Sequence, residues 1–193
     1  MPSQKIVEFI STVMPLRSFL LIKTQPGLEK EVFDKIQPFP EIREIHLIPG
    51  EFDLLAVLES PESQIDPRRN VTEVVVDRIR KLGGIVDTRL IIPIESRMRD
   101  VPSPNRPTTR GFVFIQCDVA KAKEIVTKLA ELPEVRGVHR LFGKTDILIE
   151  LEIEKSFVHP PPQHISSIVE TKISKIPGVH DTNTTVPLES IVK

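Results

Sequence analysis

The histidines and the single cysteine are the residues of this sequence with the widest chemical repertoire, because imidazole and thiolate groups bind metals and transfer protons. His46 and His139 occupy the same place in two similar stretches of sequence, and His159 and His164 flank a proline-rich segment. Two histidines without a nearby cysteine or acidic third ligand make a poor zinc site. We therefore predict no metal and interpret His46 and His139 as repeated structural residues. Cys117 ends a strand-like segment and is predicted to be a buried small side chain.

Two Gly-x-x-Asp tetrapeptides, Gly50–Asp53 and Gly143–Asp146, each lie between apolar, strand-like segments. Glycine can supply a positive φ and aspartate can cap a hairpin, so a simple turn explains each tetrapeptide. A ligand site at the same hairpins is the alternative. The sequence leaves both interpretations open.

Known catalytic signatures are missing from the sequence. It contains no Gly-x-Ser-x-Gly elbow, no Walker-type phosphate loop and no dinucleotide-binding glycine fingerprint. On this ground we predict that the chain is not an enzyme and uses no cofactor.

An internal repeat accounts for nearly the whole chain. Ser18–Glu59 aligns with Gly111–Glu152 without a gap, and after a one-residue difference the match continues from Gly84/Gly178 to Ser96/Ser190. We predict an N-terminal extension at 1–17, a first domain at 18–96, a Pro- and Arg-containing linker at 97–110, and a second domain at 111–193.

Each copy shows the same order of periodicities. An apolar run of strand length is followed by a helical face, two strand-like segments joined by four residues, a second helical face and a last strand. In the first copy, Leu28, Val32, Phe33 and Ile36 form the first helical face. The closing strands are expected at about Ile85–Ile94 and Val179–Leu188. This order predicts an α+β fold of tandem ferredoxin-like βαββαβ domains.

The sheet face opposite the helices is predicted to be apolar, because Leu21, Leu55 and Val57 alternate with partners that are also apolar. An apolar face needs cover, and the other copy is the nearest candidate. We therefore expect a pseudo-dimer within one chain, of the dimeric α+β barrel type.

Composition restricts the partners. The net charge of −1 gives no basic footprint for a phosphate backbone, so direct nucleic-acid binding is not expected. No apolar run approaches the roughly 18 residues that span a membrane, and one cysteine cannot form an internal disulfide. These features indicate a cytoplasmic protein.

The segment His139–Leu151, with Pro177-Gly178-Val179 before a Thr-rich last strand, resembles the effector-binding (RAM) domain of the Lrp/AsnC transcription regulators. That family's domain is a βαββαβ unit that pairs through its sheets. Its Gly-x-x-Asp hairpin is matched by Gly143–Asp146 and more loosely by Gly50–Asp53. The same fold also hosts haem-precursor decarboxylases and small oxygenases.

The resemblance implies a ligand site near that hairpin and the start of the last strand, in contact with a neighbouring molecule. In that site, backbone amides would hold a carboxylate and an aspartate would accept an ammonium group. Carried over residue by residue, the implied ligand-binding residues are Gly143, Lys144, Thr145, Asp146, Thr182 and Thr184, with Gly50, Asp53 and Thr88 in the first copy.

Two hypotheses for function follow from the resemblance. In the first, the chain senses an amino acid or related metabolite and regulates transcription indirectly, because the family's helix-turn-helix domain is not found in front of Ser18. In the second, it is a ligand-free assembly module that co-oligomerises with full-length regulators. Both imply a homo-oligomer or a complex with such regulators.

Overall fold

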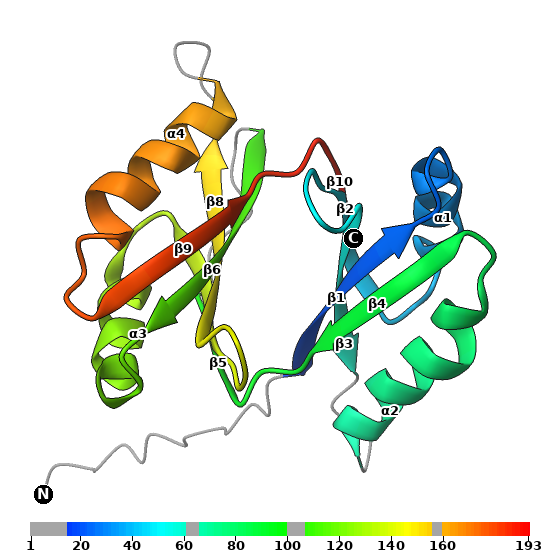
Figure 1. The fold of residues 1–193 in the computed structure, drawn as a ribbon, viewed down its shortest axis with the longest axis horizontal. Helices are drawn as coiled ribbons and strands as arrows, with labels where there is room; N and C mark the ends of the chain where they lie inside the picture. The colour runs from blue at the N-terminus through cyan, green and yellow to red at the C-terminus, as the bar shows by residue number, and fades with distance from the viewer. Residues whose placement is uncertain (1–14, 61–65, 100–106, 156–159) are drawn as a thin grey trace, which may run out of the picture.

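The computed structural model describes residues 15–60, 66–99, 107–155 and 160–193. They form two similar halves, residues 15–99 and 107–193, each with a five-stranded antiparallel sheet and two helical segments. Figure 1 shows the two sheets facing each other, with the helices on the outside. This arrangement confirms the predicted tandem α+β fold of the dimeric α+β barrel type.

The elements of the first half follow the predicted order. They are β1 (Leu16–Thr24), α1 (Glu29–Ile36), β2 (Ile42–Leu47), β3 (Leu54–Ser60), α2 (Pro67–Glu73), a π-helical turn (Val74–Arg78), a short 3-10 turn (Ile79–Lys81), β4 (Ile85–Ile91) and β5 (Glu95–Met98). Asp66 caps α2, because its side chain accepts a hydrogen bond from the Arg69 amide at 3.1 Å.

The second half repeats this order. Its elements are β6 (Thr108–Cys117), a 3-10 turn (Val119–Lys121), α3 (Ala122–Glu131), β7 (Val135–Arg140), β8 (Ile147–Glu154), α4 (Pro161–Ile168), a π-helical turn (Val169–Ile173), β9 (Val179–Thr185) and β10 (Glu189–Val192). No helix of the described residues is long and apolar enough to cross a membrane.

The halves exchange their last strands, which the sequence did not predict. The first sheet has the order β10-β2-β3-β1-β4, and the second has the order β5-β7-β8-β6-β9. In Figure 1 the red C-terminal segment therefore crosses to the half drawn in blue and cyan. The closing strands β4 and β9 end at Ile91 and Thr185, and the chain then continues into the other half's sheet.

The segment predicted to be a solvated linker contributes to both sheets. Arg97 and Met98 belong to β5, and Thr108 to Arg110 open β6. Likewise Leu16 and Arg17, assigned to the N-terminal extension, begin β1.

A shared core joins the two halves. This inter-sheet core consists of Phe19, Leu21, Ile48, Phe52, Leu55, Val57, Phe112 and Leu148. The apolar face predicted from Leu21, Leu55 and Val57 is thus covered by the other half, while two further cores fill the space between each sheet and its helices. Each fully buried apolar side chain contributes about 1.5–3 kcal/mol, so the halves are expected to depend on each other for stability.

Candidate functional site

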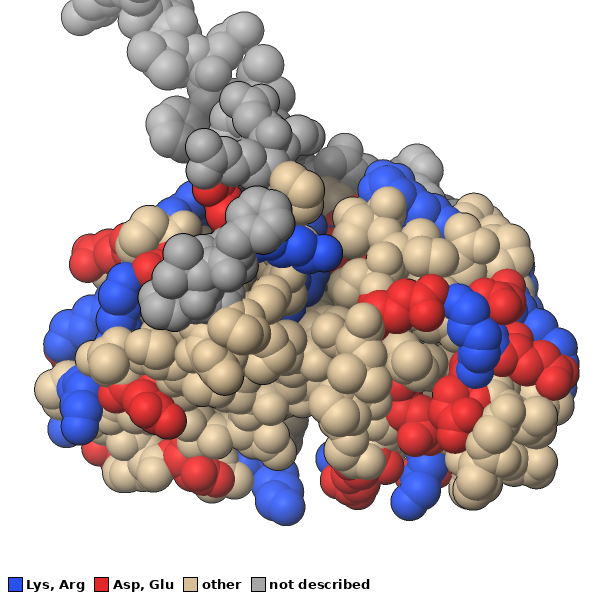
Figure 2. All heavy atoms as spheres, turned by 90° about the horizontal axis from the view of Figure 1, so that it is seen from above, with Lys and Arg blue, Asp and Glu red and all other residues tan. Residues whose placement is uncertain are grey.

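A cavity of about 1030 Å³ lies between the two sheets at the end where the Gly-x-x-Asp hairpins project. In the space-filling view the surface is notched between the two halves, with charged side chains on both sides of the notch (Figure 2). The cavity is lined from the first half by Leu21, Ile48, Pro49, Gly50, Glu51, Phe52, Arg89, Leu90, Ile91 and Ile92, and from the second by Phe114, Gln116, Leu141, Phe142, Lys144, Thr145, Asp181, Asn183, Thr184 and Thr185.

The structure brings four of the residues implied by the resemblance to this cavity: Gly50, Lys144, Thr145 and Thr184. Both hairpins turn on a glycine with positive φ, +125° at Gly50 and +134° at Gly143. L side chains rarely adopt this conformation, so the turn interpretation of these glycines has a direct structural reason.

The hairpin aspartates are engaged with the backbone of their own sheets and do not line the cavity. Asp53 Oδ2 accepts hydrogen bonds from the Thr24 amide at 2.7 Å and the Thr24 hydroxyl at 3.0 Å. Asp146 Oδ2 accepts one from the Cys117 amide at 2.9 Å. Each carboxylate thereby fastens its hairpin to the end of the first strand of its half.

The two remaining threonines also lie off the cavity lining. Thr88 of β4 and Thr182 of β9 pair with Ile22 and Ile115, on equivalent positions of the two sheets. Their side chains are half-buried.

Several lining residues were missed by sequence reasoning. Phe52 comes from the first hairpin, and Arg89 and Asn183 come from the closing strands β4 and β9, so only the facing of the two sheets places them around one space. Phe142 at the rim is 94% exposed, which is unusual for an aromatic side chain.

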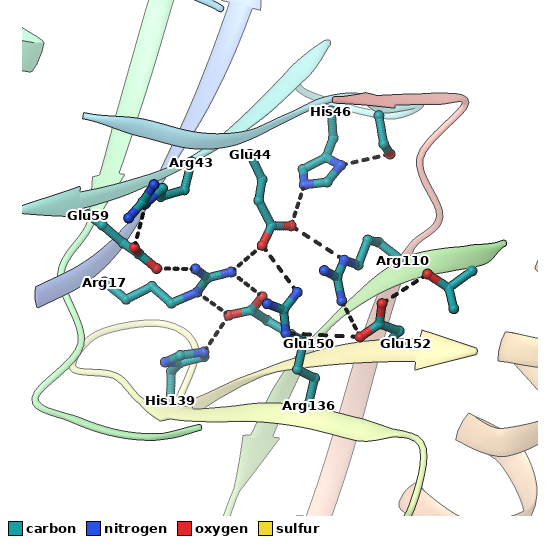
Figure 3. A network of polar contacts seen from close by, with 12 residues as sticks. Arg17, Arg43, Glu44, His46, Glu59, Arg110, Arg136, His139, Glu150 and Glu152 are labelled. Atoms are coloured by element: carbon teal, nitrogen blue, oxygen red, sulfur yellow. Dashed lines mark hydrogen bonds and ion pairs between the residues drawn. The ribbon is translucent and has the colours of Figure 1, made fainter. Parts of the chain in front are cut away.

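A buried polar network crosses between the halves beside the inter-sheet core (Figure 3). Arg17, only 5% exposed, donates from Nε and Nη2 to both carboxylate oxygens of Glu150, at 2.6 and 2.7 Å. It also donates to Glu44 and Glu59, each at 2.6 Å. Its counterpart Arg110 pairs with Glu152 at 2.7 Å. One guanidinium thus holds carboxylates from both halves, with the bidentate geometry that suits arginine.

Sequence reasoning missed this network, since it assigned Arg17 to an extension and Arg110 to a solvated linker. The signal was available, because these two arginines immediately precede the aligned segments at equivalent positions.

The histidines extend the network symmetrically. His139 Nε2 lies 2.9 Å from Glu150, and its Nδ1 lies 2.9 Å from the hydroxyl of Ser96 on the exchanged strand β5. Because an ionised carboxylate only accepts, His139 donates to Glu150 from Nε2. His46 contacts Ser190 of β10 in the same way, at 2.8 Å. The histidines are fully buried and link each exchanged strand to the network, in agreement with their interpretation as structural residues.

The two carboxylates at the centre of the network, Glu44 and Glu150, come from different positions of the repeat. The position equivalent to Glu44 is Gly137, and the position equivalent to Glu150 is Val57. A Cβ at Gly137 would lie 3.2 Å from Glu150 Oε1 and 2.9 Å from His139 Nε2, so the missing side chain makes room for Glu150. The interface is therefore built for two unlike halves.

The network determines the protonation of these carboxyls. Burial alone would raise the pKa of Glu150, but the Arg17 guanidinium and the hydrogen bond from His139 outweigh burial and hold this pKa far below its ordinary value. Burial likewise opposes ionisation of Glu44, while His46 and Arg17 lower its pKa.

We expect the free energy of unfolding to fall as the pH falls through the acid range. A carboxyl with a lowered folded-state pKa contributes stability that is fully present above its unfolded pKa and is lost below it, between about pH 5 and pH 1. Urea unfolding at a series of pH values is expected to show a loss on the order of 1–3 kcal/mol from this network. Glu150→Gln should flatten the pH dependence; an unchanged slope in this variant would show that other carboxyls dominate.

No metal-binding cluster of three or more His, Cys, Asp or Glu side chains is found in the parts of the chain that the structure describes. His164 lies in α4, whereas His159 falls outside the described residues. Cys117 is buried, and burial together with the charges of Asp146 and Asp118 raises the pKa of its thiol, which disfavours the reactive thiolate.

Solved structures that align with both halves include an enzyme and an oxidase-like protein. The siroheme decarboxylase NirDL aligns with 91% of this chain and 72% of its own, with a TM-score of 0.64 and 9% identity. An anthrone oxidase-like protein aligns over 93% of both chains, with a TM-score of 0.52 and 11% identity. The prediction that the chain is not an enzyme is contradicted by these comparisons, because this two-half fold carries catalysis in other proteins. The missing motifs belong to other folds and do not test catalysis on this one.

Sequence relatives indicate the family. An HTH-type transcriptional regulator of Pyrococcus abyssi is 26% identical over 87 residues, which are 44% of this chain and 55% of that protein. One from Pyrococcus horikoshii is 31% identical over 74 residues, 37% of this chain and 46% of that protein. The chain thus spans about half the length of the curated relatives it matches. The family model of the Lrp/AsnC ligand binding domain matches residues 110–193, so this half of the chain is similar in sequence to that family of ligand-binding domains.

Proposed function

We propose that this chain is a small-molecule sensor whose effector binds in the cavity between the two sheets. The observation that carries this proposal is the convergence of both Gly-x-x-Asp hairpins, which are equivalent in the repeat, on one space of about 1030 Å³. Ligand pockets usually measure about 300–1000 Å³, so this cavity has room for an amino acid or a larger metabolite.

The hairpins supply the proposed contacts, and their aspartates hold them in place. Lys144 and Thr145 lie at the tip of the second hairpin and line the cavity. Asp146 and Asp53 fasten each hairpin to a strand end of its own half and thereby fix each hairpin relative to its own sheet.

The output of the proposed sensor is indirect control of transcription through assembly. The relatives are named as transcriptional regulators, and the outer edges of β4 and β9 have no partner strand within the described residues. An exposed strand edge can pair with another chain. Another copy of this chain or a full-length regulator would be the partner, in the cytoplasm, where a lone cysteine such as Cys117 stays reduced.

Catalysis on a tetrapyrrole is the second candidate. It is favoured by the size of the cavity and by the alignment of both halves with NirDL, whose structure is also known with an iron-uroporphyrin III analogue. In this reading the same cavity would hold the macrocycle, and Arg89 and Lys144 would lie near its carboxylates.

Thermal unfolding in the presence of amino acids, related metabolites and iron-uroporphyrin III tests both functions. A ligand at about 100 times its dissociation constant should add roughly 2.7 kcal/mol to the free energy of unfolding. The sensor predicts stabilisation by a metabolite that is recovered unchanged. The enzyme predicts that the tetrapyrrole loses carboxyl groups, which mass spectrometry would detect.

Thr145→Phe should abolish the stabilisation, because the larger ring fills the cavity beside the second hairpin. Thr171→Phe is the matched control, since Thr171 is exposed on the π-helical turn after α4, outside the cavity lining. Equal stabilisation of both variants would place the ligand elsewhere. No stabilisation by any compound at millimolar concentration would contradict the sensor and leave the assembly hypothesis in its place.

A further inference from the structure

The two walls of the cavity are formed by equivalent positions of the repeat that carry different chemistry. We define the first wall by Phe52, Arg89 and Ile91, and the second wall by their counterparts Thr145, Asn183 and Thr185. The sheet registers support this equivalence, since Phe19 pairs with Ile91 and Phe112 pairs with Thr185. Two identical chains would give two identical walls, whereas this chain has one wall rich in apolar groups and one rich in hydroxyl and amide groups.

The charge of the first wall is compensated within that wall. Arg89 lies over the ring of Phe52, 4.9 Å from its centroid, and its guanidinium is 3.7 Å from the carboxylate of Glu51. Phe52 is buried in the inter-sheet core and Ile91 packs against the same core. The surface that this wall offers to a ligand is therefore the apolar body of these side chains.

The second wall carries uncompensated charge. Lys144 occupies the position equivalent to Glu51, and within the described part of the chain its ammonium group has no hydrogen-bond or ion-pair partner. Gln116 donates to the carbonyl of Lys144 at 3.0 Å and so fixes the hairpin backbone. Asp181 lines the same wall, also without such a partner, and can accept a donor group of the ligand.

We propose that the cavity binds one amphiphilic anion per chain in a single orientation, with an aromatic or fused-ring body against Phe52 and Ile91 and its anionic group at Lys144. This inference rests on the proposed function of the cavity and specifies the chemistry of the ligand. Burial of a ring against the first wall supplies apolar contact, and the ammonium of Lys144 supplies a charge-assisted hydrogen bond.

Two fluorescent probes that differ mainly by one charge test the proposal. Anilinonaphthalene sulfonate carries a fused ring and an anion, and N-phenylnaphthylamine has the same ring system without the charge. Fluorescence titration of the folded chain should give one site per chain for each probe and tighter binding of the sulfonate.

Substitutions in each wall test the two proposed contacts separately. Lys144→Gln should weaken binding of the sulfonate by about three- to fivefold, because an exposed ion pair contributes modestly to affinity. The affinity of the uncharged probe should not change. Lys175→Gln removes the same charge from an exposed site away from the cavity and should change neither affinity. Ile91→Thr should lower the affinity for both probes equally, whereas the reciprocal change Thr185→Ile should raise the affinity for the uncharged probe.

The outcomes distinguish this inference from the proposed function. Binding of both probes with no effect of Lys144→Gln, or with equal effects of Ile91→Thr and Thr185→Ile, would overturn the single orientation while the cavity remains a binding site. Two sites per chain would do the same. Failure of both probes and of every metabolite to bind would contradict the proposed function itself. A cooperative urea transition for each variant excludes a loosened core, because such a core binds the sulfonate without a specific site.

Discussion

Arg17→Met is expected to lower the free energy of unfolding by about 3–5 kcal/mol, because it leaves the buried carboxylate of Glu150 without its arginine. Glu150 is fully buried and Glu44 is 2% exposed, and the Arg17 guanidinium bonds directly to both. Water cannot replace the guanidinium at such depth. Methionine keeps much of the arginine's apolar stem, so the loss reports the charge and not a cavity.

Two further variants make this test specific. Arg43→Met should cost less than about 1 kcal/mol, because Arg43 is 55% exposed and, among the described residues, its side chain pairs with Glu59 alone, at 2.9 Å. Glu150→Val, which installs the residue of the equivalent position 57, should cost less in the Arg17→Met background than alone, and a double-mutant cycle in urea measures this coupling. A cost below 1 kcal/mol for Arg17→Met would mean that water reaches the network.

Phe112→Ala should destabilise the chain by about 3–5 kcal/mol and is expected to separate the unfolding of the two halves. Phe112 is fully buried in the inter-sheet core, and its ring meets that of His46 edge-on at 4.9 Å between centroids. The equivalent Phe19 meets His139 of the opposite half at 4.8 Å. Each phenylalanine thus belongs to one sheet and packs on a histidine of the other.

Phe142→Ala deletes the same ring from a position that is 94% exposed and should change stability by less than about 0.5 kcal/mol. The measurement is urea unfolding followed by circular dichroism. Intrinsic fluorescence is unsuitable because the chain has no Trp or Tyr. If Phe112→Ala does not fold, Phe112→Leu gives the milder form of the same test. An effect of Phe112→Ala no larger than that of Phe142→Ala would refute the idea of a shared core.

The interface between the halves shows how the two copies of the repeat have diverged. Gly137 and Glu150 in the second half complement Glu44 and Val57 in the first, so the repeat has diverged in a matched way at its interface. A homodimer of the first half would bury two copies of Glu44 and no Glu150, and a homodimer of the second half would bury two copies of Glu150 and no Glu44. One chain with two unlike halves keeps only one of each.

The sequence by itself determined the local structure and the facing of the two sheets. The helical faces around Val32 and Ile168 and the alternation of Leu55 and Val57 depend on neighbours in the chain, and such periodicities are visible without the fold. The repeat then supplied the partner for the apolar face, because a half-buried sheet needs cover. The Gly-x-x-Asp turns were correctly placed between strands, with Gly50 and Gly143 at positive φ.

Only the tertiary structure decided how the halves are joined. The exchanged strands β5 and β10 are four residues long, and their pairing with β7 and β2 depends on a partner in the other half. For the same reason Arg17 was assigned to an extension outside the repeat, although it contacts Glu150, which lies far along the chain. The cavity likewise arises from residues of both halves. Contacts between segments distant in sequence carry no local period, so the binding site and the buried network became visible only when the two sheets were placed face to face.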